Sequence, residues 1–209
     1  MLIRLALESD WPAIRRICVE TGPQNLVEAS VQEGELLADY WIEPYRRLWP
    51  DWTWVAIENG EVCGYMTVCP DTVAHESLKL IFLEIPQALK ILAGHYGYNP
   101  AAKKMFLRLL RRNPLPQAVW GDRLDEWNRL YPAHLHINFD TKAQGRGWGR
   151  ELMETAFRCL RANRIFGVHL FCGDAPVGFY RALGFAQKAR QRLDASASVY
   201  MFARDLNPQ

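Results

Sequence analysis

The sequence lacks the features that mark several large classes of protein. Its five cysteines include no Cys-x-x-Cys spacing, so they indicate reduced thiols rather than a disulfide framework or a metal site. No apolar run approaches the roughly 18 residues of a membrane helix, and no charged-then-apolar leader opens the chain. A net charge of +2 is too small to indicate nucleic acid as a partner. We therefore expect a soluble, cytoplasmic protein that binds neither membrane nor nucleic acid, and no metal.

What the sequence does contain is enough apolar material for one core. Of its 209 residues, 49% are apolar and 12% aromatic, and no linker divides the chain. We expect a single domain over residues 1–209.

A glycine-rich loop stands between a predicted strand and a predicted helix. Ala133 to Phe139 alternates apolar and polar residues with a period of two, which indicates a strand. After the loop, apolar residues recur at helical spacing at Leu152, Met153, Ala156, Phe157 and Leu160. A helix that begins near Gly149 has unpaired N–H groups and the positive end of its dipole at the loop. The glycines let a phosphate approach those donors, so the loop predicts a phosphate site.

The spacing of the loop selects among phosphate ligands. No Gly-Lys-Ser/Thr follows it, and Gly145, Gly147 and Gly149 do not form a Gly-x-Gly-x-x-Gly fingerprint. The run from Gln144 to Gly149 instead resembles the acetyl-CoA signature, Gln-x-x-Gly-x-Gly, of the GNAT acyltransferases. Phe179-Tyr180-Arg181-Ala182-Leu183-Gly184-Phe185 resembles the second hallmark of that family, and a predicted strand, Val168 to Cys172, lies between the two. Within the family, the chain most resembles the acetyltransferase-like domain related to O-GlcNAc hydrolases and its bacterial relatives.

The resemblance implies an α/β (α+β) fold. It predicts a mixed, mostly antiparallel central sheet that is flanked by helices, with a parallel fourth and fifth strand that splay apart. The beginning of the chain fits this order. A strand at Ile3 to Leu7 precedes a helix that Ser9 or Asp10 can cap, and Asn59-Gly60 predicts a type I′ hairpin turn.

A helical insertion is expected at about residues 71–132, because about sixty residues there need structure of their own. Asn99-Pro100 predicts the start of one of its helices, which carries several lysines and arginines. Those basic residues form either a solvated face or a contact for an acidic partner or nucleic acid. The aromatic residues between Leu36 and Trp54 either pack in the core or line an acceptor pocket.

The resemblance also implies the contacts of the cofactor. Backbone groups of Ile137, Asn138 and Phe139 are expected to hold the pantetheine arm and polarise the thioester carbonyl of acetyl-CoA. The predicted pyrophosphate site comprises Gln144, Gly145, Arg146, Gly147, Trp148, Gly149 and Arg150, with the arginines as charge partners and Trp148 in packing.

Tyr180 matches the tyrosine that protonates the leaving thiolate in the family, and its phenol is protonated at neutral pH. Gly173 stands where the family usually has an asparagine, which leaves Asp174 as a substitute. A polar row on the predicted strand, His134, His136, Asn138 and Asp140, either lines the acceptor site, with His136, His134 or Asp140 as base, or forms a hydrogen-bond network.

Two functions follow from these residues. The first is an acetyl-CoA-dependent N-acetyltransferase that transfers the acetyl group directly to a small-molecule or peptide amine. The second is a catalytically inactive acetyl-CoA-binding pseudo-acetyltransferase that serves as a binding or sensor module. The acceptor and the oligomeric state are left open.

Overall fold

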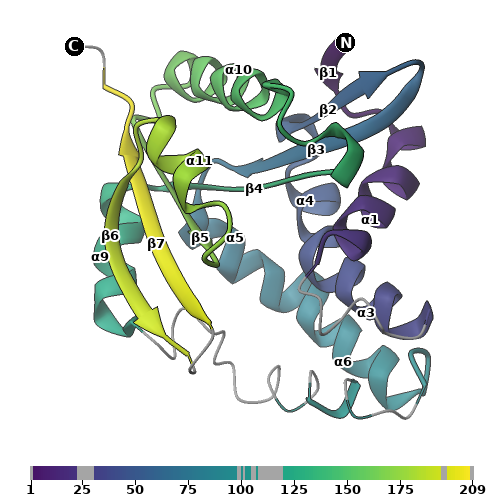
Figure 1. Ribbon diagram of the computed structural model, residues 1–209. Helices are drawn as coiled ribbons and strands as arrows, with labels where there is room; N and C mark the ends of the chain where they lie inside the picture. Colours follow the sequence, from purple (N-terminus) through teal and green to yellow (C-terminus); the bar gives the residue numbers. More distant parts are fainter. Residues whose placement is uncertain are drawn as a thin grey trace.

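A seven-stranded sheet runs through the molecule in the order β1-β2-β3-β4-β5-β7-β6 (Figure 1). The computed structural model describes residues 2–22, 31–97, 100, 102–104, 107, 120–193 and 197–207. The strands are β1 Leu2–Leu5, β2 Thr53–Glu58, β3 Glu61–Cys69, β4 Ala133–Phe139, β5 Gly167–Cys172, β6 Ala186–Arg192 and β7 Ser198–Asp205.

The sheet is antiparallel except where β4 meets β5. That parallel pair is in register only at Ala133 with Val168 and at His134 with His169. Beyond His134 the remainder of β4 pairs with β3 alone, from Leu135 to Phe139. The predicted mixed sheet with a splayed fourth and fifth strand is confirmed, and the gap opens toward the carboxyl end of β4.

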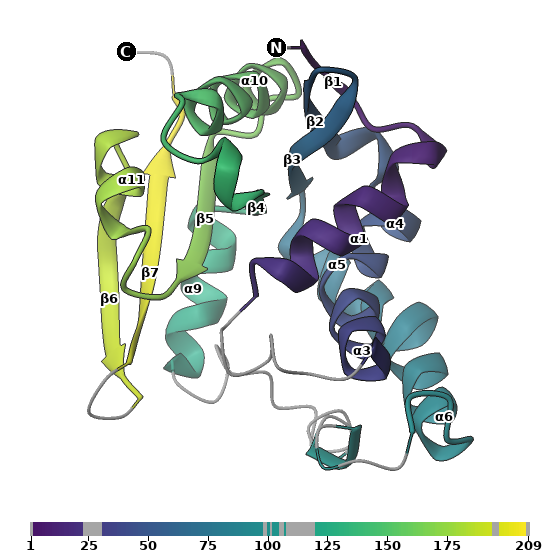
Figure 2. The ribbon, with the colours of Figure 1, turned by 45° about the vertical axis from the view of Figure 1, so that its right-hand side comes forward.

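Helices cover both faces of the sheet (Figure 2). Helix α10 (Trp148–Ala162) and helix α11 (Val177–Ala182) pack on one face. The opposite face is covered by α1 (Trp11–Glu20), α4 (Glu43–Leu48) and α9 (Asp122–Leu130), which contact β3, β4 or β5. Helix α3 (Val31–Trp41) packs outside α1 and α4. Short 3-10 turns lie at Glu8–Asp10, Pro50–Trp52 and Thr141–Ala143.

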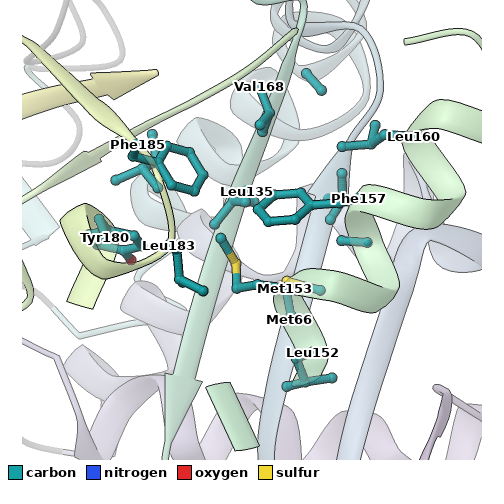
Figure 3. Close-up of a cluster of buried hydrophobic side chains, with 14 of the residues drawn as sticks. Met66, Leu135, Leu152, Met153, Phe157, Leu160, Val168, Tyr180, Leu183 and Phe185 are labelled. Atoms are coloured by element: carbon teal, nitrogen blue, oxygen red, sulfur yellow. The ribbon is translucent and has the colours of Figure 1, made fainter. Parts of the chain in front are cut away.

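The main core lies between α10 and the sheet (Figure 3). The helical spacing predicted this face, because Leu152, Met153, Ala156, Phe157 and Leu160 are all buried. In Figure 3, Met153 and Phe157 of α10 point toward Leu135 of β4. The same cluster contains Met66, Val168, Tyr180, Leu183 and Phe185. Helix α10 is thereby held with its amino terminus above the end of β4.

The start of the chain differs slightly from the prediction. Strand β1 ends at Leu5, because the Asp10 carboxylate accepts a hydrogen bond from the N–H of Leu7 at 2.7 Å and turns the chain there. Asp10 also pairs with Arg4, so its side chain does not cap α1. The predicted hairpin is present, with Asn59 at φ 53° and Gly60 at φ 85° between β2 and β3.

Between β3 and β4 the described elements are helical. They are α5 (Thr72–Lys79), a π-helical turn (Leu80–Glu84), α6 (Ile85–Leu92) and α9. The helix expected from Asn99-Pro100, with most of its basic residues, lies largely outside the described residues. Within the described part of the chain, no helix is long and apolar enough to cross a membrane.

Candidate functional site

The splay between β4 and β5 leaves backbone groups of β4 without a strand partner. The N–H of Asp140 donates to the carbonyl of Cys63 at 2.9 Å, so Asp140 and Cys63 form a hydrogen-bonded antiparallel pair. Hydrogen-bonded pairs alternate with non-hydrogen-bonded pairs along such a ladder. Asn138 therefore directs its backbone groups to β3, whereas Ile137 and Phe139 direct theirs into the gap. Of the three predicted residues, Ile137 offers its N–H and carbonyl there and Phe139 offers its N–H, whereas the side chain of Asn138 bonds Tyr65.

The glycine-rich loop presents a run of free N–H groups next to that gap. Gly145 has φ 76° and Gly147 has φ 85°, a conformation that glycine adopts without strain. Among the described residues, no carbonyl or side chain accepts a hydrogen bond from the N–H groups of residues 145–149. A Cβ on Gly145 or Gly147 would meet nothing within 4 Å, so the space above the loop is open. The loop and the dipole of α10 together form a cradle for an anion.

The side chains of the loop fix its position. Gln144 Nε2 donates to the carbonyl of Phe139 at 3.1 Å and ties the loop to the end of β4. The Arg146 guanidinium bonds the Glu58 carboxylate at 3.0 Å and lies 5.7 Å from the centre of the Trp148 ring. Arg150 donates to the carbonyl of Ala182 at 3.2 Å, at the end of α11. Both predicted charge partners thus have protein contacts, and Trp148 packs on the core.

The two sequence motifs meet through a close contact. A Cβ on Gly149 would lie 3.0 Å from Cζ of Phe179, so the absence of a side chain at Gly149 lets α10 and α11 approach each other. The next residue on α11, Tyr180, is buried and contacts the rings of Phe185 and Phe202. Its hydroxyl bonds no group in the described part of the chain. Burial, and then the neighbouring Cys172, raise the pKa of Tyr180 well above 10, so the phenol keeps its proton.

Asp174 lies on the loop between β5 and α11, and both of its carboxylate oxygens accept hydrogen bonds from β7. One accepts from the N–H of Ser198 at 3.0 Å and the other from the hydroxyl of Tyr200 at 2.8 Å. These bonds, the Ser198 bond most strongly, lower the pKa of Asp174 below its usual value. The carboxylate is therefore ionised at neutral pH and connects this loop to β7.

The predicted polar row lies on the face of β4 that is opposite α10. His136 Nδ1 is 3.3 Å from the hydroxyl of Tyr65, and Asn138 Nδ2 donates to that hydroxyl at 3.1 Å. The exposed Trp41 lies over His136, with ring centres 5.9 Å apart. Burial lowers the pKa of His136 to about 4, so its imidazole is neutral at pH 7. Asp140 is set apart, because its carboxylate pairs with Arg16 of α1 at 3.1 Å.

His134 belongs to a second, more deeply buried cluster. The Thr72 hydroxyl donates to the carbonyl of Pro132 at 2.7 Å and lies 2.8 Å from His134 Nδ1, so this nitrogen is the donor of the second bond. The Trp49 indole N–H donates to His75 Nδ1 at 3.0 Å, which leaves the proton of a neutral His75 on Nε2. His75 and His134 lie with ring centres 5.0 Å apart.

The same cluster brings possible metal ligands together. Donor atoms of Cys69, His75 and His134 all lie within 4.8 Å of one another. Burial raises the pKa of the Cys69 thiol, and the indole bond fixes His75 in the tautomer whose second nitrogen carries hydrogen. These two groups carry protons in the folded chain, and binding of a metal ion there would release them.

Several residues of the site were not found from the sequence. Tyr65 comes from β3, and Thr72 and His75 come from α5. Each reaches the polar row through packing between distant segments, and no local pattern marks it. Trp41 of α3, by contrast, is one of the aromatic residues that the sequence offered for an acceptor pocket. His169 could have been found from the sequence, because it lies in a predicted strand, at the position that pairs with His134.

Solved structures with the same architecture were found over the full length of the chain, although no family model matches it. SsHAT is 26% identical, covers 99% of this chain and 98% of its own, and has a TM-score of 0.74. A ribosomal-protein-alanine N-acetyltransferase from Brucella melitensis is 18% identical, over 98% of this chain and 99% of its own, with a TM-score of 0.54. YncA from Salmonella typhimurium, a putative acetyltransferase solved with its cofactor acetyl-CoA, is 16% identical. The match covers 100% of this chain and 95% of YncA, with a TM-score of 0.56.

Proposed function

We propose that this chain, which has the GNAT acetyltransferase fold, is an acetyl-CoA-dependent N-acetyltransferase that transfers the acetyl group directly to an amine. One observation carries the proposal: the free N–H groups of residues 145–149 and the open backbone edge at Ile137 and Phe139 adjoin each other. An anion cradle beside an unpaired strand edge suits a ligand with a pyrophosphate and an extended, amide-containing arm. Coenzyme A has both parts.

The cofactor site then has two parts. The backbone of Gly145, Gly147 and Gly149 receives the pyrophosphate, with Arg150 and Arg146 near enough to add positive charge. The N–H and carbonyl of Ile137 and the N–H of Phe139 pair with the pantetheine amides as an added strand would. Gln144 keeps these parts in register because it bonds the carbonyl of Phe139.

Acetyl-CoA supplies an activated acetyl group as a thioester. A backbone N–H on the open edge of β4 stabilises the negative charge that develops on the carbonyl oxygen during attack by the amine. Tyr180 donates its proton to the sulfur as the carbon–sulfur bond breaks, since its raised pKa keeps the phenol protonated. No cysteine is required as a nucleophile, which agrees with the raised pKa values of Cys18, Cys63, Cys69 and Cys172.

His136 is the proposed base. It lies on the same strand as Ile137, is neutral at pH 7, and can take the amine proton directly or through water. Trp41 and Asn138 beside it give the acceptor site aromatic and polar walls. Such walls suit a peptide amine, a polyamine or an amino sugar in the cytoplasm. In this scheme Asp174 positions the loop before Tyr180, because both of its oxygens are bound to β7.

The same site favours a second candidate, an acetyl-CoA-binding module without transfer. An imidazole with a pKa of about 4 is a weak base, and burial of the Tyr180 side chain raises the pKa of its phenol, which makes the phenol a weak acid. Both properties are compatible with a site that binds the cofactor but is poor at protonating the leaving thiolate and at deprotonating the amine.

Calorimetry with acetyl-CoA and free CoA, followed by measurement of thiol release over a panel of amines, tests the two functions. We expect binding of both ligands, and thiol release with at least one amine class. Binding without release over the whole panel would favour the binding module. Absence of heat and of any thermal shift with either ligand would contradict both functions.

A further inference from the structure

The outer surface of the α5–α6 segment is apolar where a surface helix is normally polar. Leu78, Ile81, Phe82, Ile85, Leu89 and Leu92 are all exposed, by fractions from 36% at Leu78 to 61% at Leu89. We name these side chains the apolar stripe. In Figure 2, α6 lies at the right-hand edge of the molecule, and none of the described elements covers its outer side.

The inner face of the same segment carries several polar side chains. Thr72, His75, Lys79 and Gln87 are buried. Lys79 Nζ lies 4.6 Å from the centre of the Tyr40 ring, and Gln87 Nε2 donates to the carbonyl of Leu36 at 3.3 Å. Leu83 and Ile91 of the segment are buried too, so the segment has apolar side chains on both its inner and its outer side, whereas an ordinary surface helix is polar on its outer side. This distribution indicates that the exposed side is an interface.

The spacing of the stripe identifies the occupant. Leu78, Ile81, Ile85, Leu89 and Leu92 follow one another at intervals of three, four, four and three residues, which read the same in both directions about Ile85. The π-helical turn adds Phe82 to the stripe, since it brings Ile81 and Phe82 to the surface together. A two-fold interface requires a surface that is complementary to itself, and a reversible spacing provides this.

We propose that a second copy of this chain covers the apolar stripe, with the two α5–α6 segments antiparallel about a two-fold axis at Ile85. Leu78 of one copy then meets Leu92 of its partner, Ile81 meets Leu89, and Ile85 meets its own counterpart. Half-exposed side chains of these types present on the order of 100 Å² each. The stripe alone therefore buries roughly 1,000 Å² over both copies, which is about the minimum for a biological interface.

This interface is independent of the proposed cofactor site. Helix α6 and the amino terminus of α10 lie at opposite ends of the molecule (Figure 1). Disruption of the stripe is therefore expected to leave acetyl-CoA binding unchanged, and that binding also reports that a variant is folded.

Light scattering during size-exclusion chromatography, from about 1 µM to about 100 µM protein, tests the assembly. The wild-type chain is expected at about twice its 24.1 kDa mass, and Ile85→Glu at the mass of the monomer, because two carboxylates would meet on the axis. Leu130→Glu is the matched control, since Leu130 is also an exposed leucine but lies on α9, and it should remain dimeric. A monomeric wild-type chain, or a dimeric Ile85→Glu variant, would overturn the proposal.

Cross-linking tests the orientation. A mixture of Leu78→Cys and Leu92→Cys chains should form a disulfide between copies under mild oxidation, whereas each variant alone should not. Ile85→Cys should cross-link to itself. Self-cross-linking of Leu92→Cys above the level of the wild-type chain would show a parallel pair and overturn the antiparallel arrangement.

Discussion

The ring of Phe139 lies so close over Gly64 that a Cβ on Gly64 would stand 2.1 Å from Phe139 Cδ1. The two residues face each other across β3 and β4, at the end of β4 that borders the splay. Phe139 also packs on the main core and accepts the Gln144 hydrogen bond through its carbonyl. The contact therefore links the position of the β4 edge to the position of the glycine-rich loop.

Gly64→Ala is expected to displace the Phe139 ring and the end of β4. The predicted result is a loss of about 1–3 kcal/mol of unfolding free energy, together with weaker acetyl-CoA binding, measured by chemical denaturation and calorimetry. Gly178→Ala is the matched control, because a Cβ there meets nothing within 4 Å and the residue is helical. Equal stability and affinity in Gly64→Ala and the wild-type chain would contradict the proposed role of this contact.

Gly147→Asp is expected to abolish acetyl-CoA binding. Gly147 has φ 85° at the start of α10, so a side chain adds strain, and a carboxylate adds negative charge where the pyrophosphate is proposed to lie. Gly94→Asp provides the control, since Gly94 has a similar φ of 76° but follows α6, far from the loop. Calorimetry should show loss of binding only in Gly147→Asp. Retained affinity in that variant would place the pyrophosphate elsewhere.

Much of the fold could be predicted from local sequence, whereas much of the site could not. Alternation at Ala133–Phe139 and helical spacing from Leu152 to Leu160 identify β4 and α10, because one buried face sets each period. Of the two predicted caps, Ser9 and Asp10, Asp10 occupies the N-cap position of α1, but its carboxylate bonds Arg4 and Leu7 and makes no cap hydrogen bond. Which groups the Asp10 carboxylate bonds depends on how the chain turns after β1.

The polar row illustrates the same limit. Its members on β4 were predicted from the strand period, but the tautomer of His134 depends on Thr72 and the surroundings of His136 depend on Tyr65. These partners come from α5 and β3 and meet β4 only in the folded chain. The apolar stripe was also missed, because apolar spacing in a sequence does not show which side of a helix faces its own core.

His136→Asn is expected to lower the rate of transfer by about 10²–10⁴-fold if His136 accepts the amine proton, with little change in acetyl-CoA affinity. Thr72→Val tests the alternative base, since it removes the hydroxyl that holds His134 Nδ1 while His136 keeps its contacts. Steady-state kinetics should show the large effect in His136→Asn only. The opposite ranking would assign the base to His134.

Tyr180→Phe is expected to reduce kcat while acetyl-CoA still binds, because only the proton donor to sulfur is removed. Burial holds the pKa of Tyr180 well above 10, so its deprotonation should cause no loss of kcat below pH 10. The pH profile of kcat checks this. Full activity in Tyr180→Phe would exclude its proposed role as the acid.

The buried imidazoles predict loss of stability in mild acid. Burial lowers the pKa of His75 to about 3 and those of His136 and His169 to about 4, from 6.5. Below pH 6.5 the unfolded chain binds protons that the folded chain does not, so stability falls as the pH falls from 6.5 to 4. Each imidazole contributes a slope of at most about 1.4 kcal/mol per pH unit. Denaturation across this range should show a smaller slope in His169→Asn, whose amide can replace the Nδ1 donor to Tyr131.

Variants of Asp174 distinguish a positioning role for its carboxylate from a catalytic one. If its carboxylate only holds the loop before α11 against β7, Asp174→Ala and Tyr200→Phe should lower Tm and kcat in the same direction, because each removes part of one connection. In that case Asp174→Asn should retain much of the activity, since its amide oxygen can still accept one of the two bonds. If the charge takes part in proton transfer, Asp174→Asn should lose kcat as severely as Asp174→Ala, while Tyr200→Phe stays active. Because the Ser198 and Tyr200 bonds use both oxygens and lower the pKa of Asp174, we expect the first pattern.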